Sequence, residues 1–298
     1  MIVNIVIGIR ENFKIPAYVM LYSLLYNNKK SQFKIYILSD KLEKQYFNKL
    51  EEQFKCQIEV VIIDIEDIKK LNPRHIDIST FYRLKIDDYI PKNIDKLLYL
   101  DTDLIVNGDI SELLTIDLDE ENCVAAVKCG VSKKHLKNIG FKNDPYFNAG
   151  VIFFDYQKCL KEKIFSDALK LIIEDEKNYI FMDQDVLNIT LKGKVKFLDL
   201  KWNFGSFYAK SELLASKKFF SSNPIIVHYT GKYKAWNYEN INQYAYLYHK
   251  YYEMGFSEKF EYNNIGMKEK IIKKTKLFFY NFFLTRKIIF HIRNNLRK

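Results

Sequence analysis

The sequence predicts an α/β fold in which a sheet carries helices on both faces, followed by a basic C-terminal helical tail. Short apolar runs typical of buried strands alternate with helical segments, which argues for a parallel sheet with helices on both faces. The 298 residues can bury a substantial core, and they include only 10 glycines and 5 prolines. Ligands of such sheets bind beyond the carboxyl ends of the strands.

The first elements follow one another as strand, helix, strand, helix, strand. Residues 2–9 are apolar and lack the basic segment of a secretion signal, so we expect the first strand there. Pro16 opens an apolar helix that ends at Asn27 and Asn28. Three elements continue the alternation: a strand over 33–38, a charged helix over 41–54 and a strand over 58–63.

Composition favours a globular protein with a water-facing surface. Hydrophobic residues make up 48% of the chain and charged residues 28%, which argues against disorder and against a polytopic membrane protein. The four cysteines show no C-x-x-C spacing, so we expect reduced cysteines, no zinc site and a cytoplasmic location.

The basic charge is concentrated in the tail. Residues 268–298 hold ten Lys or Arg against one Glu, a net charge of +9, whereas the first 267 residues carry +1. A neutral body with a basic tail favours an anionic membrane surface over nucleic acid as the partner. We therefore expect a catalytic domain over 1–264 and a membrane-associating tail over 265–298.

The tail is also aromatic and amphipathic. Its longest uncharged run, Leu277 to Thr285, has nine residues, which is too short to span a bilayer because a spanning helix needs about 20 residues. An apolar helical stripe is predicted to lie on the inner face of the cytoplasmic membrane. The alternative is that this helix docks on the body or on a second subunit. The stripe consists of Ile271, Phe278, Phe282 and Ile289.

Two carboxylates interrupt an apolar strand near the middle of the chain, at Asp101 and Asp103. Burying them is costly unless they are paired or bound to a cation, and oxygen ligands suit Mg²⁺ or Mn²⁺. The alternative is a strand that ends at Leu100, followed by two solvated loop aspartates. The chain has neither G-x-G-x-x-G after its first strand nor a P-loop, so a bound nucleotide would need another way to neutralise its phosphates.

Five segments in one order give the chain a resemblance to a known family. They are Ser79–Ile86, Lys96–Val106, Phe147–Val151, Asp183–Asp185 and His228–Trp236. Together, from about Ile2 to Trp236, the chain resembles family 8 of the glycosyltransferases. These are retaining enzymes of the GT-A fold, a Rossmann-like mixed sheet that binds nucleotide sugars, and they include lipopolysaccharide galactosyl- and glucosyltransferases and relatives of glycogenin.

The resemblance implies a metal centre. Asp101, Asp103 and His228 would bind Mn²⁺, with Mg²⁺ as the alternative, and the ion would hold the diphosphate of the donor. Gly231 would allow close backbone approach to phosphate, and Lys234 would add a positive charge there as the leaving group departs. The alternatives from the residues alone are a strand-end histidine at His228 and an exposed loop lysine at Lys234.

The resemblance also implies donor-binding residues. Arg83 would reach the donor sugar or diphosphate; the alternative is an ion pair with Asp87 on the same helix. Asp183 would accept sugar hydroxyls and, from the residues alone, is also a candidate to cap its helix, two roles that can coexist. Gln184 would stabilise an oxocarbenium-like centre during displacement on one face. Further contacts to the donor would come from Gly8, Asn12, Ile76, Thr102, Asn148, Ala149 and Gly150, with the last three leaving room for the sugar ring.

One departure from the family concerns the nucleobase. Arg10 stands where the family usually has an acidic residue, and an arginine cannot accept the uracil N3 proton. Three explanations stay open: Glu11 substitutes for that residue, the backbone suffices, or the base preference differs. UDP remains the expected nucleotide.

These expectations combine into one function. We expect a hexosyltransferase that moves glucose or galactose from a UDP-sugar to a glycan or glycolipid of the bacterial envelope, with a lipopolysaccharide core as the leading acceptor. The alternatives are a protein or capsular acceptor, or a non-catalytic envelope-assembly scaffold. Acceptor residues are expected between Gly193 and Ser222, where four aromatic side chains offer stacking surfaces or form part of the core: Trp202, Phe204, Phe207 and Tyr208.

Overall fold

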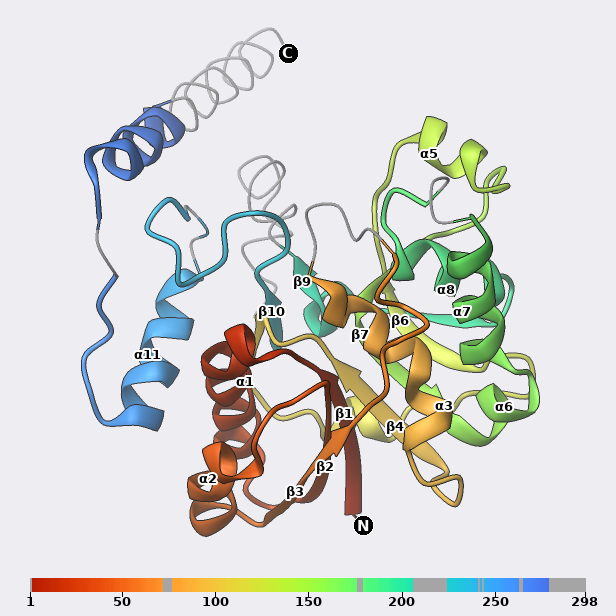
Figure 1. The fold of residues 1–298 in the computed structure, drawn as a ribbon, viewed down its shortest axis with the longest axis horizontal. Helices are drawn as coiled ribbons and strands as arrows, with labels where there is room; N and C mark the ends of the chain where they lie inside the picture. The colour runs from red at the N-terminus through yellow and green to blue at the C-terminus, as the bar shows by residue number, and fades with distance from the viewer. Residues whose placement is uncertain are drawn as a thin grey trace, which may run out of the picture.

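A computed structural model describes residues 2–71, 77–175, 179–205, 224–240, 242, 244–262 and 265–278. The predicted α/β class is confirmed, with one large sheet between two layers of helices (Figure 1). The sheet has seven strands in the order β3-β2-β1-β4-β7-β6-β8. Their bounds are β1 Ile2–Gly8, β2 Gln32–Ser39, β3 Cys56–Ile62, β4 Lys96–Leu100, β6 Val124–Lys128, β7 Phe147–Asp155 and β8 Val195–Leu198.

The sheet is mixed. Strand β7 pairs antiparallel with both β4 and β6, whereas the β1–β2, β2–β3, β1–β4 and β6–β8 pairs are parallel. The start of β7 therefore lies beside the carboxyl end of β4. This places Asn148, Ala149 and Gly150 next to the aspartates that follow β4.

Alternating side chains of the strands build one core on each face of the sheet. On one face, Ile5 and Ile7 belong to a cluster with α1 (Lys14–Asn27) and α11 (Ala245–Phe256). On the other face, Val6 belongs to a cluster with residues of four helices. These helices are η3 (Ile78–Lys85), α6 (Tyr156–Lys161), α7 (Ile164–Asp175) and α8 (Asp183–Thr190).

The predicted helix over 41–54 is wrong in extent. The segment forms a 3-10 turn, η2 (Lys44–Phe47), and a six-residue helix, α2 (Asn48–Gln53). Each of these supplies one buried side chain, Phe47 and Leu50, so only a short stretch packs against the sheet. The remaining short elements are η1 (Glu11–Phe13), α3 (Ile86–Tyr89), α4 (Ser111–Leu114), α5 (Lys133–Asn138) and η5 (Leu200–Trp202).

A second, three-stranded sheet has the order β5-β10-β9. Strand β10 (Ile226–His228) runs antiparallel to β5 (Leu104–Val106) and parallel to β9 (Phe204–Gly205). Its register sets His228 opposite Leu104, and the amide of Tyr229 donates to the carbonyl of Asp103 at 2.8 Å. The small sheet thus brings His228 to the end of β4, although more than a hundred residues separate the two in sequence.

The described part of the tail is helical over 267–278 and extends beyond the layer formed by α11 (Figure 1). Lys276 donates to the carbonyl of Glu239 at 3.0 Å and lies over the ring of Tyr233, while Lys273 lies over Tyr238. Ile271 and Phe278 of the predicted stripe are exposed, by 56% and 66%; Phe282 and Ile289 lie outside the described residues. Among the described helices, none has the length and apolar character needed to cross a membrane.

Candidate functional site

The two aspartates after β4 and the histidine that ends β10 form one cluster. One ligand atom from each of Asp101, Asp103 and His228 can be chosen so that all three lie within 4.8 Å of one another. His228 Nε2 is 3.0 Å from Asp103 Oδ1 and 3.6 Å from Asp101 Oδ2. All three side chains are largely buried, so a strand end with two solvated aspartates is not what the structure shows.

Asp101, Asp103 and His228 are called the triad below, and Gly150 provides the space in which they come together. A Cβ atom at Gly150 would lie 2.2 Å from His228 Cε1 and 2.7 Å from Asp101 Oδ2, well inside any permitted contact. The amide of Asp101 also donates to the Gly150 carbonyl at 2.8 Å. The absence of a side chain at Gly150 therefore makes room for the triad itself.

Arg83 holds the carboxylates on the other side of the triad. Its guanidinium donates to Asp101 Oδ1 at 2.6 Å and to the Ala149 carbonyl at 2.6 Å, and its Nε lies 3.0 Å from Asp183 Oδ2. The guanidinium also lies 4.3 Å from the ring centre of Tyr99, whose hydroxyl donates to Asp101. The alternative pairing of Arg83 with Asp87 is therefore wrong, because Arg83 points into the site.

Burial and ion pairing set the charges in this cluster. Burial would lower the pKa of Arg83, but Asp101 and Asp183 hold it above its ordinary value. Burial raises the pKa of Asp183 to about 6, although Arg83 opposes that shift. Asp183 also accepts from the Thr80 hydroxyl at 2.5 Å, so this carboxylate bonds to two side chains of η3.

Lys234 forms an ion pair with Asp103 Oδ2. Burial would raise the pKa of Asp103, but the charge of Lys234 holds it well below its usual range. The loop before Lys234 turns at Gly231, whose φ of +92° strongly favours glycine. Lys234 is only 23% exposed, so it is not a free loop lysine.

Polar side chains connect the triad to α8. His228 Nδ1 lies 2.9 Å from Asn203 Oδ1, and Asn203 donates to Asn148 Oδ1 at 2.8 Å. Asn148 donates to Gln184 Oε1 at 2.9 Å, and the amide of Ala149 donates to the same oxygen at 3.1 Å. The predicted sugar-binding residues therefore share one hydrogen-bond network with the predicted metal ligands.

The network ends in a buried carboxylate. Gln184 Nε2 donates to the Tyr146 hydroxyl at 3.1 Å, and that hydroxyl donates to Asp185 at 2.5 Å. Asp185 also accepts from the amide of Phe181 at 2.8 Å and lies 2.8 Å from His135 Nε2. Burial and the neighbouring Asp185 hold the pKa of Tyr146 far above its usual range, so Tyr146 remains a hydrogen-bond donor.

Some of the residues predicted to bind the nucleotide lie at the end of β1, the strand next to β4 in the sheet. Gly8 ends β1 and packs under Tyr82, while Asn12 donates to Asp77 at 3.3 Å on the surface. Thr102 is buried between the two aspartates. Ile76 lies outside the described residues.

At the same edge of the sheet, Arg10 lies 3.6 Å from Asp40, which follows β2. Three buried polar atoms here lack a hydrogen-bond partner within the described part of the chain: Arg10 Nε, Asp40 Oδ1 and the Tyr82 hydroxyl. Glu11 instead pairs with Lys14 on the surface. Of the two carboxylates, Asp40 is therefore the one beside Arg10.

Two of the four aromatic residues proposed for the acceptor belong to the core. Trp202 and Phe204 are 2% and 0% exposed, so they offer no stacking surface. Phe207 and Tyr208 lie outside the described residues.

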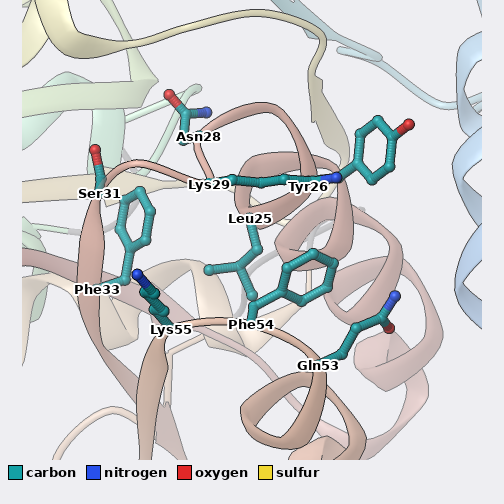
Figure 2. Close-up of a pocket in the computed structure, with 9 residues that line it drawn as sticks. All are labelled: Leu25, Tyr26, Asn28, Lys29, Ser31, Phe33, Gln53, Phe54 and Lys55. Atoms are coloured by element: carbon teal, nitrogen blue, oxygen red, sulfur yellow. The ribbon is translucent and has the colours of Figure 1, made fainter.

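A separate cavity of about 290 Å³ lies at the opposite end of the parallel strands (Figure 2). The end of α1, the turn into β2 and the end of α2 line it, with Leu25, Phe33 and Phe54 as its apolar walls. None of the triad or network residues lines it. This cavity is not the site predicted from the motifs.

Several contact residues of the site were missed by the sequence analysis. Asn203 and Tyr146 stand in segments with no motif of their own, whereas Thr80 and Tyr99 lie inside two of the five motif segments but are not singled out by them. Asp185 follows Gln184 directly in the sequence, and its carboxylate is 0% exposed and bonds to protein groups.

Comparisons with known proteins agree with these observations. A sequence model described as glycosyl transferase family 8 matches residues 4–240. The lipopolysaccharide 1,2-glucosyltransferase of Escherichia coli is 30% identical over 249 residues, covering 78% of this chain and 73% of that protein. The lipopolysaccharide 1,3-galactosyltransferase of Salmonella typhimurium is 30% identical over 247 residues, with the same coverage.

Among solved structures, the galactosyltransferase LgtC in complex with donor and acceptor sugar analogs aligns with a TM-score of 0.71 at 23% identity. The alignment covers 90% of this chain and 99% of that one. This likeness shows that the two chains share a fold, as the sequence predicts.

Proposed function

Because the chain belongs to glycosyl transferase family 8, we propose that it is a metal-dependent, retaining hexosyltransferase that moves glucose or galactose from a UDP-sugar to a glycan of the bacterial envelope. The observation that carries this proposal is the cluster of Asp101, Asp103 and His228 in one network with Arg83 and Gln184. A scaffold that had lost turnover would have no need to keep these costly buried charges together.

The donor set of the triad fits a divalent cation. Two carboxylates and one imidazole suit Mn²⁺, with Mg²⁺ as the alternative, and the few protein ligands leave positions for phosphate oxygens. Gly150 supports the assignment because it lets the ligand groups converge. When bound, the ion would supply positive charge to the diphosphate of the donor as that group leaves.

The protein's own cations would act beside that ion. Lys234 pairs with Asp103 and would bind the β-phosphate, where negative charge develops. Arg83 fixes the orientation of Asp101 and keeps Asp183 beside it. Asp183 would then bind the hexose hydroxyls on the side away from the nucleotide.

Gln184 would lie under the anomeric carbon. Its amide oxygen is held by Asn148 and by the amide of Ala149, so the oxygen has a fixed direction. A carboxamide is a poor nucleophile, but its dipole can stabilise an oxocarbenium-like centre while the acceptor attacks the face from which UDP leaves. Asp185 is engaged by three protein donors, which favours this displacement over a covalent intermediate on that carboxylate.

The nucleoside would extend from the triad toward β1 and β2, away from the sugar-binding residues near α8. Within the described residues, buried polar atoms of Arg10, Asp40 and Tyr82 lack a well-formed hydrogen bond, which supports a polar ligand at that edge. Asp40 could accept the uracil N3 proton, the role that Arg10 cannot perform. UDP is the nucleotide that we propose.

The acceptor proposal rests on the relatives and on the tail. Two relatives with 30% identity are named for glucosyl or galactosyl transfer in lipopolysaccharide. The basic tail with exposed Ile271 and Phe278 suits an enzyme that works on a lipid-linked acceptor at the inner surface of the cytoplasmic membrane. We therefore propose a lipopolysaccharide or lipooligosaccharide core as acceptor.

A donor screen tests the function. With Mn²⁺ present, the enzyme should release UDP from UDP-glucose or UDP-galactose and not from other nucleotide sugars, and EDTA should stop the release. With acceptor present, proton NMR should show the α configuration of the donor in the product. Release that is indifferent to EDTA, or a β-linked product, would contradict the proposal.

Removing the tail tests its membrane role. A protein ending at Asn264 should stay folded and keep UDP release, yet lose co-sedimentation with anionic vesicles, because each basic group near such a surface contributes about 1 kcal/mol. Salt should weaken binding of the full-length protein only in part, since the apolar contacts are not screened. If the shortened protein aggregates or loses UDP release, the tail belongs to the folded body through contacts such as that of Lys276 with Glu239.

A further inference from the structure

The network between the triad and α8 has a direction that follows from its donors and acceptors. Asp185 only accepts, so Tyr146 donates to it and must itself accept from Gln184 Nε2. This turns Gln184 Oε1 toward Asn148, where the amide of Ala149 also donates to it. A carboxylate at one end and a backbone donor in the middle thus fix the carboxamide of Gln184 in one orientation.

The same reasoning fixes the next two side chains. The NH₂ group of Asn148 donates to Gln184 Oε1, and Asn148 Oδ1 accepts from the amide of Gly150 at 3.0 Å. Asn203 therefore approaches Asn148 Oδ1 with its NH₂ group, at 2.8 Å. Its remaining oxygen faces His228 Nδ1 at 2.9 Å. Because that oxygen can only accept, Nδ1 of His228 must carry a hydrogen.

This tautomer matters for the metal. In the neutral imidazole, a hydrogen on Nδ1 leaves the lone pair on Nε2, and Nε2 is the atom that faces Asp103 and Asp101. A lone pair aimed at two carboxylates is unfavourable until a cation lies between them. Asn203 is 3% exposed and His228 is 3% exposed, so water does not readily replace this bond.

We propose that Asn203 is a positioning residue that holds His228 in the tautomer required of a metal ligand and couples the metal triad to the donor-binding residues Asn148 and Gln184. The proposal rests on the proposed function, since it takes the triad to be a metal site. Asn203 performs two separable tasks: its oxygen orients His228 and its nitrogen orients Asn148. A polar partner on the second nitrogen of a ligand histidine typically changes metal affinity by about 10- to 100-fold.

Two substitutions at one position separate these tasks. Asn203→Ala removes both, so the Mn²⁺ affinity of the donor-free protein, measured by the loss of the free Mn²⁺ EPR signal, should fall about 10- to 100-fold. Asn203→Asp keeps an acceptor for His228 but loses the donor to Asn148. We expect Mn²⁺ affinity close to that of the wild type and a lower kcat for transfer at saturating Mn²⁺. The matched control is Asn138→Ala, at the exposed end of α5, which should change neither quantity.

The possible outcomes distinguish this proposal from the proposed function. If wild-type protein binds no Mn²⁺, the metal assignment itself is wrong. If wild type binds Mn²⁺ but Asn203→Ala binds it equally well, or if both substitutions lower affinity by the same factor, the positioning role of Asn203 is wrong.

A direct readout is the tautomer of His228 in the metal-free, ¹⁵N-histidine-labelled protein, which contains only five histidines. With the imidazole neutral, wild type and Asn203→Asp should show the Nδ1–H form. The Nε2–H form in wild type would overturn the inference.

Discussion

Replacing Gly150 with alanine should abolish Mn²⁺ binding and Mn²⁺-dependent UDP release. The new methyl carbon would occupy positions 2.2 Å from His228 Cε1 and 2.7 Å from Asp101 Oδ2, so at least one ligand must leave the triad. His228 cannot swing aside without breaking its bond to Asn203. Mn²⁺ titration by EPR and UDP release measure the two losses, and Gly150 itself has no side chain that could bind the ion.

Gly130→Ala is the matched control for this substitution. A Cβ at Gly130 meets no atom within 4 Å, so the same chemical change should leave Mn²⁺ binding and UDP release intact. Wild-type Mn²⁺ affinity in the Gly150→Ala protein would show that the triad does not hold the ion.

Replacing Arg83 should have the next largest effect. Arg83→Met leaves Asp101 and Asp183 without their buried partner, a change that typically costs about 3 to 5 kcal/mol of unfolding free energy, and it should also end transfer. Arg83→Lys keeps the charge but cannot bond Asp101, Asp183 and the Ala149 carbonyl together. It should therefore be more stable than Arg83→Met while kcat/KM stays strongly reduced.

A substitution at the neighbouring Lys85 is the control that distinguishes a loss of stability from a loss of activity. Lys85 lies on the same η3 segment, is equally buried and pairs with Asp67 instead of a site residue. Lys85→Met should lower the melting temperature with UDP release retained per folded molecule. If Arg83→Lys turned over UDP-sugar as fast as wild type, Arg83 would have only the structural role that Lys85 has.

The three proposed metal ligands could be selected from the sequence because each belongs to a motif. Asp101 and Asp103 interrupt an apolar strand, and His228 precedes a Gly-x-x-Lys segment. Their meeting required the register of β10 on β5, which no local pattern specifies. Asn203 and Tyr146 could not be predicted, since their importance comes only from the atoms that they face.

The sequence also did not show which strand runs antiparallel to its neighbours. The apolar run of β7 would suit a parallel or an antiparallel strand, and only its pairing with β4 and β6 shows that it runs antiparallel to both. The role of Gly150 could not be predicted from the sequence either. Its small size suggested room for a sugar ring, whereas the structure fills that space with His228 and Asp101.

The central claim is that Asp101, Asp103 and His228 hold the cation that binds the donor diphosphate. The most direct test is a crystal structure of the enzyme with Mn²⁺ and UDP, with data collected at the manganese absorption edge. The account predicts one anomalous peak at coordination distance from all three side chains and from the diphosphate, with the uracil toward Arg10 and Asp40. A manganese peak elsewhere, or UDP bound without contact to the triad, would contradict it.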